Sequence, residues 1–216
     1  MVLNPGTSWL SRGFIFIALF IGFGGLQLYF SYRFPGTSWE LFFKGLSGAM
    51  AFLIALNTGF VLNYNSSIPF WNSALLPILF ILCGVLDGLA VMMTIGLFAG
   101  GVNLDAAEEI SRWLLVINPI LIAIYLWSGT YMGPTGKQSV KTLVRGPIAP
   151  IFWMGVVLCG VLLPISISIG SYFFGGPPAL LLIMATAFEM VGTFSLKYSI
   201  LKGALYHPLV PGSVHT

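Results

Sequence analysis

Residues 146–188 read GPIAPIFWMGVVLCGVLLPISISIGSYFFGGPPALLLIMATAF, without a single Asp, Glu, Lys or Arg. A helix needs roughly 20 apolar residues to cross the ~30 Å hydrocarbon core of a bilayer, so this stretch is long enough for two crossings. Residues 46–86 form a second stretch without charge. Only 7 % of the chain is charged, against about 25 % in soluble domains. We therefore predict an all-α integral membrane protein.

Six apolar blocks of spanning length fit between the charged residues, so we predict a six-span transmembrane helix bundle that forms a single membrane domain over residues 1–216. The first block has no small-residue cleavage site after it and is expected to remain in the protein. The longest loop, 133–147, contains Gly133-Pro134 and Gly146-Pro147, which are turn signals. The predicted spans cover residues 9–32, 39–62, 72–100, 107–132, 148–172 and 178–203.

Lysine and arginine are distributed unequally between the two ends of the predicted bundle. With six spans, both termini lie on the same side, and cytoplasmic loops carry an excess of these residues. The termini are therefore predicted to be cytoplasmic. The side with the termini carries Arg12, Lys137, Lys141, Arg145 and Lys202, and the other side carries Arg33, Lys44 and Arg112.

Small residues at packing distance indicate a compact bundle. Gly84 with Gly88 and Gly96 with Gly100 form GxxxG pairs in the predicted third span. Glycines at this spacing let helix backbones approach closely in lipid. The pairs argue for tight packing and not for a particular function.

Two carboxylic acids lie in the middle of predicted spans. Asp87 lies within the third span and Glu189 within the sixth, and Lys197 follows Glu189 by about two helical turns on the same face. An ionisable group in a bilayer costs about 2.5–3.5 kcal/mol on insertion scales and is a functional candidate. Two interpretations stay open: a proton path through Asp87, Glu189 and Lys197, or a buried polar cluster that fixes helix register.

The residue types that bind metals and haem are absent from the predicted spans. The two histidines, His207 and His215, lie in the C-terminal tail, and haem in a membrane helix needs axial ligands within the helices. Cys83 and Cys159 are isolated and are interpreted as packing residues. We therefore predict no metal site, no haem and no covalently bound cofactor. The basic residues are spread over loops and indicate no nucleic-acid binding.

Three segments carry a resemblance to a known family. The first is NPGTSWLSRG at 4–13, which is similar to a Ser-Trp-x-x-Arg-Gly box. The second is NTGFVL at 57–62, which resembles a Tyr-Thr-Gly-x-x-Leu stretch. The third and most specific is PFWNSALLPILF at 69–80, which is very similar to a Pro-x-Trp-Asn-x-x-x-Leu-Pro-x-x-Phe helix opening. In this order, they resemble the NrfD-like family, the integral membrane subunit of polysulfide-reductase-like complexes.

The resemblance implies a cofactor-free membrane subunit of a quinone-linked respiratory oxidoreductase in a prokaryotic cytoplasmic (inner) membrane. Menaquinone or ubiquinone would be its exchangeable substrate. The implied partners are a ferredoxin-like iron–sulfur subunit and a molybdopterin catalytic subunit, and protons could be conducted along the acidic residues described above. The quinone-site candidates that the matching boxes supply are Trp9, Arg12, Asn57, Thr58, Trp71 and Asn72.

The chain departs from the family pattern in two ways. The six spans match the last six of at least eight, so the first two family helices have no counterpart and a second membrane chain could complete the site. Asn57 stands where the family has tyrosine; its amide can bond a quinone carbonyl but cannot act as a phenolic proton donor. Two other functions stay open: a structural anchor without quinone chemistry, and a small proton-coupled transporter.

Overall fold

The computed structural model describes residues 8–174 and 179–206, and this part of the chain is helical without any strand. Within it, six segments are long and apolar enough to span a membrane. The predicted all-α class and the six spans are thereby confirmed. The segments are α1 (Trp9–Arg33), α2 (Ser38–Asn63), α3 (Leu75–Ala99), α4 (Leu104–Thr130), η1 (Ile151–Leu162) continued by α6 (Leu163–Phe174), and α7 (Ala179–Gly203).

The span boundaries differ from the predicted ones by a few residues. α3 begins at Leu75 rather than at residue 72, after a loop whose Ile68 and Phe70 are buried. α4 begins at Leu104 because the Asn103 side chain accepts a hydrogen bond from the backbone N–H of Ala106, at 3.1 Å. Three predictions fall outside the described residues: the start of the first motif (4–7), the start of the last span at 178, and the tail containing His207 and His215.

The loop predicted at 133–147 is wrong for most of its length, because the structure has a helix there, α5 (Gly133–Arg145). Gly133 adopts φ +79°, and the proline after it stands in the first helical turn, where its missing N–H costs nothing. The Gly-Pro pair thus starts a helix. One face of α5 is buried at Ser139 and Leu143, while the lysines and the arginine project from the other face.

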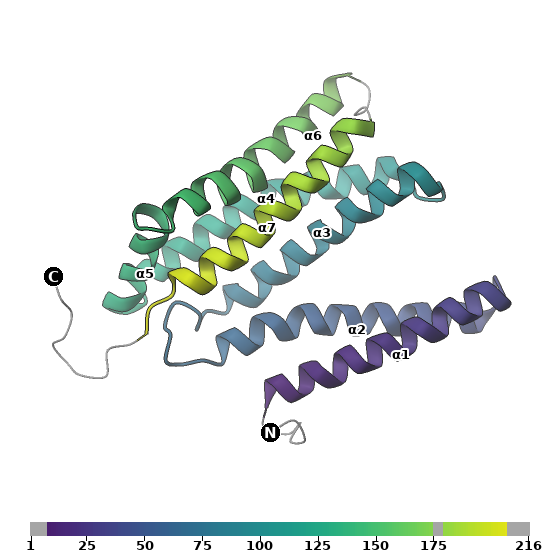
Figure 1. The fold of residues 1–216 in the computed structure, drawn as a ribbon, viewed down its shortest axis with the longest axis horizontal. Helices are drawn as coiled ribbons and strands as arrows, with labels where there is room; N and C mark the ends of the chain where they lie inside the picture. The colour runs from purple at the N-terminus through teal and green to yellow at the C-terminus, as the bar shows by residue number, and fades with distance from the viewer. Residues whose placement is uncertain (1–7, 175–178, 207–216) are drawn as a thin grey trace.

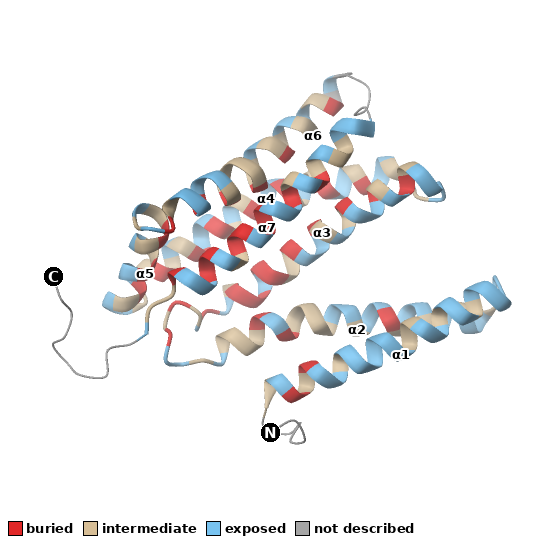
Figure 2. Ribbon diagram, viewed as in Figure 1, coloured by how far each residue is buried: buried red, intermediate tan, exposed pale blue. Residues whose placement is uncertain are grey.

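The helices form a bundle made of α3, α4, α5, η1, α6 and α7, and the hairpin of α1 and α2 lies beside it (Figure 1). α7 contacts α3, α5, α6 and η1, whereas α1 packs only against α2 among the described elements. Buried residues therefore concentrate along α3, α4 and α7, and most of α1 and α2 is exposed (Figure 2). The start of α1 and the end of α7 lie toward the same end of the molecule as α5 (Figure 1).

Close packing is made at some of the predicted glycines and at others that the pairs did not include; a Cβ atom on Gly96, from the second GxxxG pair, would overlap Val102. A Cβ atom on Gly192 of α7 would overlap the backbone of Gly160 in η1, and one on Gly59 of α2 would overlap Pro77 of α3. A Cβ atom on Gly88 would meet no described atom within 4 Å. A Cβ atom on Gly84 would stand 4.0 Å from Ala55 of α2, an ordinary contact, so the expected close approach is not made at Gly84 and Gly88, and the Gly160–Gly192 contact brings two helix backbones together instead.

We predict that Gly192→Ala destabilises the bundle by about 1–3 kcal/mol, because the added methyl group forces α7 away from η1. The thermal unfolding midpoint of the purified protein in detergent measures this. Gly22→Ala in α1 is the control, because a Cβ atom there meets nothing within 4 Å. An equal loss in both variants would contradict the packing assigned to Gly192.

Candidate functional site

The first group of predicted site residues lies where α1 begins and α2 ends. The Trp9 ring stacks on Phe60, with centroids 5.0 Å apart and planes 14° apart. The Arg12 guanidinium carbon lies 4.6 Å from the Trp9 ring centroid, which is cation–π distance. This arrangement joins the first turn of α1 to the last turns of α2 and produces an aromatic and cationic surface at the end of the molecule where α1 starts.

Asn57 lies on the inner face of α2 and is buried, with 8 % of its surface exposed. Its amide nitrogen is packed so closely on Gly13 that a Cβ atom there would overlap it. The Oδ1 atom is buried and has no hydrogen-bond partner. A buried amide oxygen without a donor costs about 1–3 kcal/mol, so this atom is the natural acceptor for a ligand hydroxyl or water.

The remaining predicted quinone-site residues do not join this group directly. Thr58 is exposed and its hydroxyl donates to the Ile54 carbonyl of its own helix at 3.0 Å. Trp71 lies in the α2–α3 loop and donates its indole N–H to the Ile200 carbonyl of α7 at 3.0 Å. Asn72 is exposed in the same loop. The structure thus brings Trp9, Arg12 and Asn57 together, while Trp71 ties the loop to α7.

Asp87 has two polar partners on α7. The Thr193 hydroxyl donates to its two carboxylate oxygens, at 2.8 and 3.1 Å. The Lys197 ammonium lies 3.7 Å from Asp87 Oδ2 and 5.9 Å from the centroid of the Phe80 ring. A carboxylate and an ammonium that pair in a bilayer avoid the cost of two isolated charges. The cluster joins α3 to α7.

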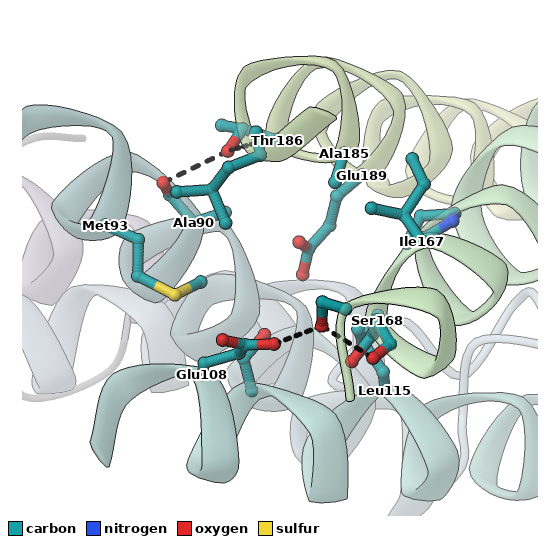
Figure 3. Close-up of a pocket in the computed structure, with 13 residues that line it drawn as sticks. Ala90, Met93, Glu108, Leu115, Ile167, Ser168, Ala185, Thr186 and Glu189 are labelled. Carbon is teal, nitrogen blue, oxygen red and sulfur yellow. Dashed lines mark hydrogen bonds between the residues drawn. The ribbon is translucent and has the colours of Figure 1, made fainter. Parts of the chain in front are cut away.

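Glu189 differs from Asp87 in having no partner for one oxygen. It is 4 % exposed, and its Oε1 atom makes no hydrogen bond. Its carboxyl group points into a small cavity of about 30 Å³ between α3, α4, α6 and α7 (Figure 3). Across this cavity are Glu108 and Ser168. Glu189 and Thr193 are four residues apart, so they are neighbours on one face of α7.

An apolar hollow lies on another side of the bundle. Its volume is about 260 Å³, and its lining includes Pro119 and Leu126 of α4, Val144 of α5, and Trp153 of η1. The Trp153 indole N–H donates to the Val144 carbonyl at 3.0 Å. The hollow can accommodate a hydrocarbon chain but presents few groups that would orient a polar head.

Sequence reasoning missed several polar residues that the structure places in these groups. Thr193 lies four residues from both Glu189 and Lys197, and this spacing alone would have put it on their face. Glu108 and Arg112, also four apart, form an ion pair at 2.9 Å. Asn118 is buried with an unpartnered Oδ1. In the described residues, no three metal-binding side chains of the His, Cys, Asp or Glu types come together.

The fold and these groups define a multi-pass helical membrane protein with one buried carboxyl group, that of Glu189, inside its bundle and a polar aromatic cluster at one end. The sequence pattern of the polysulphide reductase, NrfD family matches residues 2–208. Because the match covers nearly the whole chain, the protein belongs to this family, as the three motifs predicted.

Three relatives show how the chain compares with longer members. It is 26 % identical to the protein NrfD homolog of Haemophilus influenzae, over 70 % of this chain and 49 % of the relative. It is 30 % identical to a polysulfide reductase subunit of Wolinella succinogenes, over 56 % and 40 %, and 28 % identical to protein NrfD of Escherichia coli, over 70 % and 49 %. The chain thus spans about half or less of the length of these relatives.

Proposed function

We propose that this protein is the membrane subunit of a prokaryotic respiratory oxidoreductase complex, where it binds a quinone or quinol and exchanges electrons with an iron–sulfur partner subunit. The observation that carries the proposal is the Trp9–Arg12–Asn57 group at the end of α1 and α2. Membership of the polysulphide reductase, NrfD family supports it. A molybdopterin subunit would then hold the terminal substrate, and the quinone would be menaquinone or ubiquinone.

The proposed chemistry uses the protein for binding and orientation. A quinol gives up two electrons and two protons: the electrons pass one at a time to the nearest cluster in the partner, and the protons pass to water or side chains. Trp9 supplies an aromatic face for the ring, and Asn57 Oδ1 accepts a hydrogen bond from a quinol hydroxyl. The Arg12 guanidinium favours oxygen atoms that carry developing negative charge.

The end of the molecule where α1 starts and α7 ends is the proposed docking face for the iron–sulfur partner. Lys137, Lys141 and Arg145 follow one another at four-residue spacing along α5, and all three are exposed. The six acidic residues of the chain all lie elsewhere. A basic surface without acidic residues favours an acidic partner. The docking face would comprise residues 9–12, 63–72 and 137–145.

The same charge distribution supports cytoplasmic termini, since positively charged loops tend to stay on the cytoplasmic side. The matched part covers about half of the relatives' length. Most of α1 and α2 is exposed, and we include in the proposal a second membrane chain that completes the quinone site beside this hairpin.

The direct test is quinol oxidation by the purified complex with Asn57→Ala. Loss of one hydrogen bond to the substrate predicts a rate about 2- to 10-fold lower. Phe52→Leu is the matched control, because Phe52 lies on the same helix with 52 % of its surface exposed. An unchanged rate in Asn57→Ala, with the complex intact, would move the site elsewhere and favour a structural anchor.

Proton conduction is a second proposed function, favoured by the two carboxyl groups of α3 and α7. Glu189 lies one helical turn from Thr193, which is bonded to Asp87, and Asp87 is paired with Lys197. We propose that a proton taken up by Glu189 moves through this cluster toward the end with the termini. The competing interpretation, a small proton-coupled transporter, uses the same residues without a quinone.

Glu189→Gln keeps the shape of the side chain and removes its titration, so it should abolish proton movement while electron transfer continues. The measurement is proton uptake per electron in proteoliposomes that contain the complex. Ser166→Ala serves as the control, because the Ser166 hydroxyl is exposed and bonds its own helix, at 2.7 Å from the Leu162 carbonyl. If Glu189→Gln builds the same gradient per electron as the unmodified complex, the carboxyl group is structural.

A further inference from the structure

The cavity in front of Glu189 has a second polar wall, at the end of the bundle opposite the termini. Glu108 of α4 pairs with Arg112 at 2.9 Å, and the Ser171 hydroxyl of α6 donates to the same carboxylate. The Arg112 Nε–H donates to the Ser168 hydroxyl at 3.3 Å. Glu108, Ser168 and Ser171 line the cavity together with Glu189 (Figure 3). The Ser171 hydroxyl also donates to the Ser168 carbonyl at 2.8 Å, which closes these contacts into a polar ring between α4 and α6.

The ring lies near the membrane surface and Glu189 lies deep. At 1.5 Å per residue, Glu108 is about 6 Å from the start of α4, and Glu189 is about 15 Å from the start of α7. Both helices begin at the same end of the bundle (Figure 1). Glu189 thus lies about 9 Å deeper in the bundle than Glu108, and both residues line the cavity.

The cavity has room for about two water molecules. The space that the centre of a water-sized sphere can occupy in it is about 30 Å³, and one water needs about 10–15 Å³ by this measure, together with two to four polar partners. The oxygen atoms of Glu108, Ser111, Ser171 and Glu189 are available along its wall. The unpartnered Oε1 atom of Glu189 is one of the atoms that such water would satisfy.

We infer that this cavity is a hydrated vestibule that carries protons from the membrane face opposite the termini to Glu189. The inference rests on the proton-conducting role proposed above and assigns its uptake side. A proton leaves a hydronium ion at the Glu108–Arg112 ring, passes along cavity water and binds the Glu189 carboxylate, and the hydronium ion becomes water. Arg112 keeps its charge throughout.

The charged groups around Glu189 fit this direction. From α4, Glu108 stands on the proposed uptake side with Arg112 as its counter-ion. From α3, Asp87 stands on the other side of Glu189, held by Thr193 and Lys197. The walls from α6 and from the adjacent turn of α7 contribute hydroxyl groups, at Ser168, Ser171 and Thr186. Glu189 therefore lies between an outer acidic group and an inner one.

Cysteine labelling tests whether water reaches this depth. Cys83 and Cys159 are first replaced by alanine in the intact complex. One variant then carries Leu115→Cys, in the cavity wall. The other carries Val116→Cys, at a similar depth but on the outside of the bundle, where Val116 has 46 % of its surface exposed. A charged, membrane-impermeant thiosulfonate reacts with the thiolate, which requires water. We expect labelling at position 115 at least about 10-fold faster than at 116, from the face opposite the termini only.

Equal rates at the two positions, or labelling of position 115 from the side of the termini, would overturn the vestibule. Ser111→Cys is a second cavity position that changes one atom and protects the test against misfolding of Leu115→Cys. The labelling requires neither quinone nor electron transfer, so its failure is separate from failure of the proposed function.

Proton uptake tests the role of the polar ring. Glu108→Gln should slow uptake from the opposite face while electron transfer continues, and Glu109→Gln, an exposed neighbour on α4, should not. Equal effects of the two variants would overturn the uptake role of Glu108. The two experiments can also disagree. If position 115 is labelled as expected but Glu189→Gln still takes up protons fully, the cavity contains water and the proton-conducting function is refuted.

Discussion

The contact of α7 with α3 through Asp87, Thr193 and Lys197 is the constraint on which the arrangement of the bundle depends. Charged side chains in a bilayer are costly unless they are paired or reach water, so the position that satisfies Asp87 fixes how α7 lies along α3. Gly192, next to Thr193, meets Gly160 of η1 at backbone distance. Adjacent residues thereby hold α7 to two neighbours, and Glu189 is placed at the cavity as a consequence.

The two proposed functions use opposite ends of the molecule. The Trp9–Arg12–Asn57 group belongs to the α1–α2 hairpin at the end with the termini, and the hairpin contacts the rest of the described bundle through α3. The Glu108–Arg112 ring belongs to the opposite end. Asp87 and Glu189 lie between them. A route from the ring through these carboxyl groups would connect the uptake of protons to the end where a quinone would be bound.

The sequence predicted the fold because the decisive signal was the length of the stretches without charged residues. This length can be measured without knowing which helices contact one another. The sequence also singled out Asp87 and Glu189 as functional candidates, since an ionisable group is costly in a bilayer. It failed at α5, where Gly133-Pro134 was interpreted as a turn although proline is equally suited to the first turn of a helix. It also failed at Gly88, because a GxxxG spacing does not reveal whether a second helix faces it.

The quinone-site candidates illustrate a further limit of sequence reasoning. The second motif made both Asn57 and Thr58 candidates for the quinone site. Side chains of consecutive helical residues point about 100° apart, so Asn57 is buried and Thr58 is exposed. The Glu108–Arg112 pair was visible as a four-residue spacing, yet only the tertiary structure shows Ser171 and the cavity beside it. Contacts between distant segments decide which polar residues form a site.

The central claim, a quinone site between the start of α1 and the end of α2, is tested most directly by photolabelling. A photoreactive quinone analogue is crosslinked to the intact complex, and the modified peptides are identified by mass spectrometry. The account predicts labelling within residues 9–13 or 57–60 that excess native quinone suppresses. Labelling confined to the apolar hollow at Pro119 and Trp153, or labelling that native quinone does not suppress, would contradict it.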